Sequence, residues 1–303
     1  MVRAVIDIGS NSIKMRIAAI NSGNVRVIRD ETEVVRLGRG MSSTGLLSQE
    51  SMKVSCDAVA RMVHRASMMG AEIFIAGTMA LRTAGNSSEF VKMVKDATGQ
   101  EIHIFSGTEE AKYSWLGAVE GLNLKGDTVM FDSGGGSTEF VLGSGSAIKK
   151  TASVPVGAVN LSERFFTVKD SPIKQTACDE AVKFVMKMLA DNHIEDFRVP
   201  SCQVIGVGGG VAAMASVKNA CESFSPQTLH GTILTRRDIS RQINMYASLT
   251  LSERENVIGL PASRADVILG SACIVFTALR VLDVHSCVVS INGLRHGLLM
   301  HEE

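Results

Sequence analysis

Two short segments of the chain, 125 positions apart, carry the same chemically useful pattern of an apolar strand followed by Asp, Gly and Ser. In the first, the apolar run 4–6 leads to Asp7, with Gly two positions and Ser five positions further on. In the second, the run 129–131 leads to Asp132, and Gly and Ser follow at the same spacings. A second apolar stretch follows each pattern, so each segment is expected to form a β-hairpin with small residues at its tip.

The residues at these tips suit a bound phosphate. Gly and Ser allow successive backbone N–H groups to point into one concavity, which matches the oxygens of a phosphate. An Asp at the end of a buried strand is costly unless it is neutralised, and a divalent cation would neutralise Asp7 and Asp132. Two such tips could hold a phosphate chain and its Mg²⁺ from both sides. The alternative is an ordinary tight hairpin with a turn-favouring Asp, and this alternative is weaker for the matched pair than for either segment alone.

A third glycine-rich segment, Gly206–Gly210, joins an expected strand at 203–207 to a helix that begins near Val211. The first N–H groups of a helix have no partner within the helix, so a glycine turn at that point is a candidate anion site. Such turns also use Gly for steric reasons alone, and the segment is a weak signal by itself.

The elements around these segments alternate between strand and helix. The spacing of apolar residues predicts a helix at 48–70, strands at 72–76 and 101–105, and a helix that begins near Ser106 with acidic residues in its first turn. The order β-β-α-β-α-β-α indicates an α/β domain with helices on both faces of its sheet. A second α/β region is predicted after it, with helices near 179–192, 237–251 and 263–282 and a strand at 286–291.

Composition excludes several classes of protein. The 31 basic and 31 acidic residues give zero net charge, which disfavours a surface that coats nucleic acid. The six Cys residues contain no C-x-x-C pair, which argues against structural zinc and for a reducing compartment. Neither a membrane span nor a signal peptide is evident, because the first apolar run is interrupted at Asp7. We therefore expect a cytoplasmic protein with no membrane and no nucleic-acid partner.

Taken in order along nearly the whole chain, these segments resemble the exopolyphosphatase/guanosine pentaphosphate phosphohydrolase (Ppx/GppA) family. Each motif alone is weak or moderate, but their joint occurrence in this order is specific. The resemblance implies an α/β chain with the duplicated actin-like (ribonuclease H-like) fold, with two domains at 1–123 and 124–292, a cleft between them, and a C-terminal helix at about 293–303 that packs back on the first domain. The matching motifs are Asp7–Ser12, Gly77–Asn86, Ser106–Ala111, Asp132–Glu139, Val156–Val159, Gly206–Gly209, Ser263–Gly270 and Gly293–Arg295.

The resemblance also implies roles for single residues. Glu110 would be the general base that activates water, Glu139 would help to orient that water, and Asp7, Asp132 and Glu139 would hold Mg²⁺ or Mn²⁺. This fits phosphoryl transfer, which needs an in-line nucleophile and compensation of charge on the phosphate oxygens. The residues expected to bind phosphate are Ser10, Asn11, Ser12, Arg82, Gly134, Gly135, Gly136, Ser137, Gly208 and Gly209.

Simpler interpretations remain for some of these residues. Glu109 and Glu110 could be first-turn acids favoured by the helix dipole, and Arg82 could be a solvated residue at a helix start. Lys14 replaces an Arg that is frequent after the first motif, and we expect it to face outward.

Three further positions depart from the family pattern. Ser133 replaces an apolar residue, Gly210 replaces a Thr, and His296 replaces an acidic residue. These changes concern secondary contacts and leave the candidate carboxylates intact.

The function favoured by the sequence is an exopolyphosphatase that removes the terminal phosphate of inorganic polyphosphate. The close alternative is hydrolysis of the 5′ γ-phosphate of guanosine pentaphosphate, or both activities. More remote alternatives are an actin-like ATPase or kinase and a non-catalytic sensor of polyphosphate or of an alarmone. The resemblance further implies a homodimer.

Overall fold

The computed structural model describes residues 1–21, 24–222 and 226–301. The chain divides into two compact units. The first unit combines Met1–Gly117 with Leu294–Glu303, and the second unit is Ala118–Gly293. The last segment of the chain therefore belongs to the same unit as the first.

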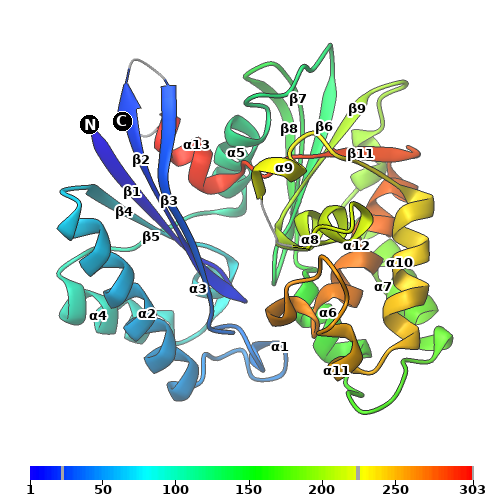
Figure 1. Cartoon of the computed structure of the whole chain (residues 1–303), viewed down its shortest axis with the longest axis horizontal. Helices are drawn as coiled ribbons and strands as arrows, with labels where there is room; N and C mark the ends of the chain where they lie inside the picture. Colours follow the sequence, from blue (N-terminus) through cyan, green and yellow to red (C-terminus); the bar gives the residue numbers. More distant parts are fainter. Residues whose placement is uncertain (22–23, 223–225, 302–303) are drawn as a thin grey trace. The chain divides into compact units, whose positions relative to one another are not determined.

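The first unit contains a five-stranded mixed sheet in the order β3-β2-β1-β4-β5 (Figure 1). Strands β1, β2 and β3 are antiparallel neighbours, whereas β4 and β5 continue the sheet in parallel on the other side of β1. The bounds are Val2–Ile8 for β1, Ser12–Asn21 for β2, Asn24–Val34 for β3, Glu72–Gly77 for β4 and His103–Ile104 for β5.

Strand β3 was not among the expected elements because its sequence lacks an apolar face. It is an edge strand, and its charged side chains pair with helix α2 (Gln49–Met68). Arg65 binds both Glu31 and Glu33, and Arg61 also binds Glu33. Charged side chains are typical of an exposed sheet edge. They interrupt the alternation of apolar and polar residues from which a strand is predicted.

Helices cover both faces of this sheet. Helices α2 and α4 pack on one face around Ile6, Met15 and Phe90. Helix α13 packs on the opposite face of β1 and β2, where Val5 and Leu298 are both buried. Besides α2, the helices of this unit are α1 (Met41–Thr44), α3 (Met79–Thr83), α4 (Ser87–Thr98), α5 (Gly107–Ala118, which reaches the boundary between the units) and α13 (Leu294–His301).

The second unit repeats the first sheet and adds one strand. Its order is β10-β11-β9-β6-β7-β8, in which β6, β7 and β8 are antiparallel and β9 and β11 follow in parallel beyond β6. Strands β6, β7 and β8 thus correspond to β1, β2 and β3. The bounds are Thr128–Ser133 for β6, Thr138–Ser144 for β7, Ala147–Val154 for β8, Gln203–Val207 for β9, Ile233–Thr235 for β10 and Ser286–Val289 for β11.

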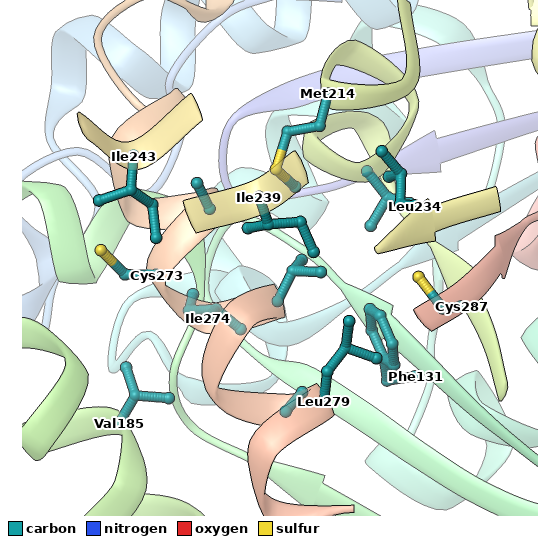
Figure 2. Packing of buried hydrophobic residues seen from close by; sticks show 14 of the residues in the cluster. Phe131, Val185, Met214, Leu234, Ile239, Ile243, Cys273, Ile274, Leu279 and Cys287 are labelled. Atoms are coloured by element: carbon teal, nitrogen blue, oxygen red, sulfur yellow. The ribbon is translucent and has the colours of Figure 1, made fainter. Parts of the chain in front are cut away.

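The core of the second unit is built around helix α12 (Ile268–Val281). Figure 2 shows Ile274 of α12 between Val185 of α7 and Ile239 of α10, with Phe131 of β6 close by. The other helices of this unit are α6 (Ala158–Phe165), α7 (Gln175–Asp191), α8 (Gly209–Lys218), α9 (Pro226–Leu229), α10 (Arg236–Ser248) and α11 (Leu251–Arg254), with short 3-10 turns at Ile194–Phe197 and Ala262–Arg264.

Two mixed sheets with the same strand pattern, each flanked by helices, confirm the predicted α/β class and its duplicated architecture. Among the described residues, no helix is both long and apolar enough to cross a membrane. All six cysteines are free thiols.

Candidate functional site

The first tip joins β1 to β2 and is closed by a hydrogen bond from the Gly9 N–H to the Ser12 carbonyl, with an N···O distance of 3.1 Å. The three side chains that follow Gly9 are buried, although they are polar. Because Asp7 pairs with Lys14 in the antiparallel register, both side chains project from the same face of the sheet.

The carbonyl groups of this tip are held by the segment that follows β3. The Gly38 N–H donates to the Ser10 carbonyl at 2.8 Å, and the Arg36 N–H donates to the Asn11 carbonyl at 2.9 Å. The C=O and N–H of a trans peptide point in opposite directions, and no peptide bond of the described chain is cis. The N–H groups of Asn11 and Ser12 therefore point away from this segment.

The side chain of Asn11 is a further polar group at this tip. It is only 7% exposed, and neither its Oδ1 nor its Nδ2 has a hydrogen-bond partner among the described residues. A buried amide normally has such a partner, so a ligand that accepts and donates hydrogen bonds would satisfy it.

The second tip joins β6 to β7 and repeats the first in detail. The Gly134 N–H donates to the Ser137 carbonyl at 2.9 Å. The carbonyls of Gly134, Gly135 and Gly136 then accept hydrogen bonds from the start of helix α6. Their donors are Ala158 N–H at 3.0 Å, Val159 N–H at 2.7 Å and the Asn160 side-chain amide at 2.9 Å, respectively.

The same peptide geometry turns the N–H groups of the second tip away from α6. These are the N–H groups of Gly135, Gly136 and Ser137, which form a concavity of consecutive donors. Gly157 makes this approach of α6 feasible, because a Cβ at that position would lie 2.4 Å from the Gly135 carbonyl carbon.

Asp132 and Glu139 are cross-strand partners at the base of the second tip. Their side chains share one face of the sheet, and Glu139 is 2% exposed and accepts a 2.8 Å hydrogen bond from the Ser153 hydroxyl. Gly293 lies next to Asp132, where a Cβ would come within 2.9 Å of Val207 Cγ1 and within 3.7 Å of Asp132 Oδ2.

This pair of carboxylates fits a hard divalent cation. Mg²⁺ usually binds one or two carboxylates and completes its shell with water and phosphate oxygens. No group of three or more His, Cys, Asp or Glu side chains suited to a metal occurs in the described part of the chain. The third predicted ligand, Asp7, belongs to the first unit, where Lys14 Nζ lies 3.9 Å from its Oδ2.

Glu109 and Glu110 have different environments, although both lie in the first turn of α5. Glu109 caps the helix, because its carboxylate accepts hydrogen bonds from the N–H and the hydroxyl of Ser106, at 2.8 and 2.7 Å. These hydrogen bonds hold the pKa of Glu109 below its ordinary value. Glu110 instead forms an ion pair with Arg82 of α3, with Nη1 and Oε2 3.0 Å apart. The simpler interpretation as a helix-start acid therefore applies to Glu109.

Helix α3 is attached to the first tip. The N–H and the hydroxyl of Thr78 both donate to the Ile8 carbonyl at 3.2 Å. One residue later, the sulfur of Met79 lies 4.0 Å from the Ser10 hydroxyl. The structure thus gathers Asp7, the first tip, Arg82 and Glu110 in the first unit, and it gathers Asp132, Glu139 and the second tip in the second unit.

The glycine run between β9 and α8 belongs to the second unit and lies next to the end of β6. Gly208 has φ of +116°, and a Cβ on it would lie 2.3 Å from the Ser133 carbonyl oxygen. A Cβ on Gly209 would lie 2.1 Å from a guanidinium nitrogen of Arg264. The positive φ of Gly208 and its close approach to the Ser133 backbone require Gly at that position, and the absence of a side chain at Gly209 lets the guanidinium lie against the turn.

Arg264 is a candidate residue that the sequence did not single out. Burial lowers the pKa of its guanidinium, and the charge of Asp266 opposes this effect. The guanidinium lies at the N-terminus of α8, whose dipole also disfavours a cation. An anion at this turn would compensate both costs. The only sequence signal was the motif Ser263–Gly270, because Arg264 lies 55 positions from Gly209.

Lys14 is oriented differently from the expectation. It pairs with Asp7 across the hairpin and lies on the same face of the sheet, so it does not simply face outward. His296 lies in helix α13, with its Nδ1 3.4 Å from Arg16 Nη1. At Gly210, a Cβ would lie 2.4 Å from the Ser271 hydroxyl, which occupies the space of the missing side chain.

Comparison with known proteins assigns the chain to a family. The model of the Ppx/GppA phosphatase family matches residues 16–303. A putative exopolyphosphatase of Haemophilus influenzae is 28% identical over 98% of this chain and 90% of its own length. A guanosine-5′-triphosphate,3′-diphosphate pyrophosphatase of Vibrio cholerae is 30% identical over 98% of this chain and 58% of its own length. The chain spans only part of the length of the curated relatives that it matches, 46% in one case and 58% in another.

A solved structure agrees with this assignment. The crystal structure of the Aquifex aeolicus Ppx/GppA family member is 28% identical and has a TM-score of 0.82. The match covers 99% of this chain and 96% of that chain.

Proposed function

Because the chain belongs to the Ppx/GppA phosphatase family, we propose that it is an exopolyphosphatase that hydrolyses the terminal phosphate of inorganic polyphosphate with water activated by a carboxylate. The observation that carries this proposal is the repeated tip. In both units an Asp-bearing strand ends in a loop whose carbonyls are bound on one side, which turns its N–H groups to the other.

We propose that each tip binds phosphate oxygens. In the first unit the N–H groups of Asn11 and Ser12 would donate to them, and in the second unit those of Gly135–Ser137 would do so, as backbone donors do in other anion sites. In the first unit the guanidinium group of Arg82 would bind phosphate oxygens of the substrate, and in the second unit that of Arg264 would do the same.

Glu110 is proposed as the base. Its carboxylate would take a proton from water while the water oxygen bonds to the terminal phosphorus and the bridging P–O bond breaks, releasing orthophosphate and the shortened chain. Mg²⁺ or Mn²⁺, held in the second unit by Asp132 and Glu139, would supply charge neutralisation at the phosphate oxygens. The Ser153 hydroxyl, which donates to Glu139 Oε1 at 2.8 Å, would restrain this carboxylate.

A second candidate substrate is guanosine pentaphosphate, which the pyrophosphatase relatives favour by their names. It presents the same terminal phosphoanhydride, so the tips and the base would serve both substrates. We also propose that the protein is a cytoplasmic homodimer. Its six free thiols suit a reducing compartment, and light scattering coupled to size-exclusion chromatography would measure the oligomer.

The test offers the purified chain with Mg²⁺ four substrates, which are polyphosphate, guanosine pentaphosphate, ATP and an aryl phosphate. We expect orthophosphate from polyphosphate, from guanosine pentaphosphate, or from both. Release of orthophosphate from ATP alone would indicate an ATPase. Release from none of the four substrates would reject the proposal that the protein is an enzyme of this kind.

The same assay tests the base with a matched pair of variants. Glu110→Gln should lower kcat by roughly 10²- to 10⁴-fold, the usual contribution of a general base, and leave KM nearly unchanged. Glu109→Gln changes the adjacent acid in the same helical turn, and it should retain near-normal turnover because that acid caps the helix.

A further inference from the structure

Arg82 contacts the candidate base directly. Its Nη1 lies 3.0 Å from Glu110 Oε2 and donates to the Phe105 carbonyl at 2.8 Å. Both side chains are largely buried, with exposed fractions of 22% for Arg82 and 13% for Glu110. Limited contact with water makes this ion pair more effective in fixing geometry than a surface pair would be.

Helix α5 begins with capping hydrogen bonds between Ser106 and Glu109. The carboxylate of the next residue, Glu110, binds Arg82. Arg82 comes from α3, a different element, and its guanidinium also binds the carbonyl of Phe105, two residues before α5 begins. Arg82 therefore fixes both the carboxylate and the segment from which α5 starts.

The Arg82 guanidinium can make further hydrogen bonds. Within the described ranges of the chain, both hydrogen bonds of Arg82 come from Nη1. An Arg side chain carries five N–H donors in a rigid fork, so Nη2 and Nε could still donate to a phosphate oxygen. Helix α3 is attached to the first tip through Thr78 and Met79, which places these donors on the same support as that tip.

We propose that Arg82 is a positioning residue for Glu110 in addition to a phosphate ligand. Nη1 holds Oε2 of the carboxylate, and the other nitrogens of the fork bind the terminal phosphoryl group. One side chain then sets the relative position of base and phosphorus. This inference rests on the proposed function, because it requires that Glu110 is the base.

The test is a double-mutant cycle with Arg82→Gln and Glu110→Gln, assayed on tripolyphosphate and guanosine pentaphosphate with Mg²⁺. Arg82→Gln alone should lower kcat about 10- to 100-fold, part of the contribution of a general base, and raise KM. In the Glu110→Gln background, the same substitution should change kcat by less than about twofold but raise KM as before, because positioning is lost with the base and phosphate binding is not.

Arg82→Lys provides a second measurement if the doubly substituted enzyme is too slow to assay. Lys keeps the charge and lacks the fork, so it can serve the phosphate or the carboxylate but not both. We expect a near-normal KM with kcat reduced about tenfold or more. A raised KM with normal kcat would show that Arg82 only binds phosphate, and would overturn the inference.

The outcomes separate this inference from the proposed function. Kcat losses that multiply in the double variant would mean that Arg82 acts independently of Glu110, while the assignment of the base would stand. Near-normal turnover of Glu110→Gln alone would reject the base itself, and the positioning role with it. Lys92→Gln, which breaks an exposed pair with Asp96 in the same unit, is the control and should leave kcat and KM unchanged.

Discussion

At the scale of single residues, Lys14 places a positive charge on the same sheet face as Asp7, next to the first tip. A phosphate chain at this tip would gain a charge-assisted hydrogen bond from its ammonium group. We expect Lys14→Met to raise KM for polyphosphate about tenfold, the effect of one such bond, with a smaller change in kcat. Lys14→Arg should keep KM near normal.

The control for this prediction is Lys53→Met, which removes an exposed lysine of α2. Its KM should stay unchanged at the ionic strength used for Lys14→Met. An unchanged KM for Lys14→Met as well would mean that this side chain only balances the charge of Asp7.

The orientation of Lys14 also shows what local sequence can and cannot predict. The spacing of Asp7, Gly9 and Ser12 correctly predicted a hairpin tip, because strand, turn and strand are contiguous. The same tip fixes the pairing of Asp7 with Lys14 and hence the shared face, a step that composition alone does not suggest. Arg264 and the donors that bind the tip carbonyls come from distant segments of the sequence, and only folding brings them to these positions.

At the scale of elements, helices α8 and α12 meet where Gly210 lies against Ser271. Gly210→Thr would restore the residue frequent in the family but would force its Cβ into the Ser271 hydroxyl. We expect it to destabilise the protein by about 1–3 kcal/mol, the usual cost of overpacking. The double variant Gly210→Thr/Ser271→Gly also removes the hydroxyl and the Cβ at position 271, and it should recover most of this loss of stability.

Chemical denaturation of the four proteins of this cycle measures the coupling. Ser271→Gly alone should cost about 1 kcal/mol, because Gly is unfavourable within a helix. A double variant no more stable than the sum of the two single changes would show that the residues at 210 and 271 do not share the space.

The elements themselves were predicted unevenly, for physical reasons. Helix α2 and strand β4 have clear apolar periods and were predicted nearly to their ends. Strands β3 and β8 were missed because they are edge strands with many polar side chains. These missed strands matter for the structure of the tips, since the segments that follow them donate the hydrogen bonds to the tip carbonyls.

At the scale of the whole chain, the last helix returns to the unit in which the chain begins. Helix α13 covers β1 and β2 and closely approaches α5, since a Cβ at Gly297 would lie 1.9 Å from the Tyr113 carbonyl oxygen. A cluster of charged side chains also attaches helix α13 to the sheet. Asp30 of β3 accepts hydrogen bonds from Arg295 of α13 and from Arg16 of β2.

This cluster makes the stability of the protein depend on pH. Burial raises the pKa of Asp30, but the charges and hydrogen bonds of Arg295 and Arg16 outweigh it, so the pKa is held below the ordinary value. A carboxyl with a lowered pKa stabilises the folded state above its unfolded pKa of about 3.9. That stabilisation is lost as the pH falls through the folded value.

Asp30→Asn should therefore lower the free energy of unfolding at pH 7 by about 3 kcal/mol, since Arg16 is 4% exposed and would lose its charged partner. The difference from the parent protein should shrink as the pH falls below about 4, where the unfolded chain takes up a proton at this carboxyl, and it should be lost once the folded carboxyl is protonated as well. Urea unfolding at several pH values measures both effects. Asp96→Asn, in an exposed pair, should change stability by less than about 0.5 kcal/mol at any of these pH values. A loss for Asp30→Asn that persists undiminished in acid would mean that shape, and not charge, attaches the last helix.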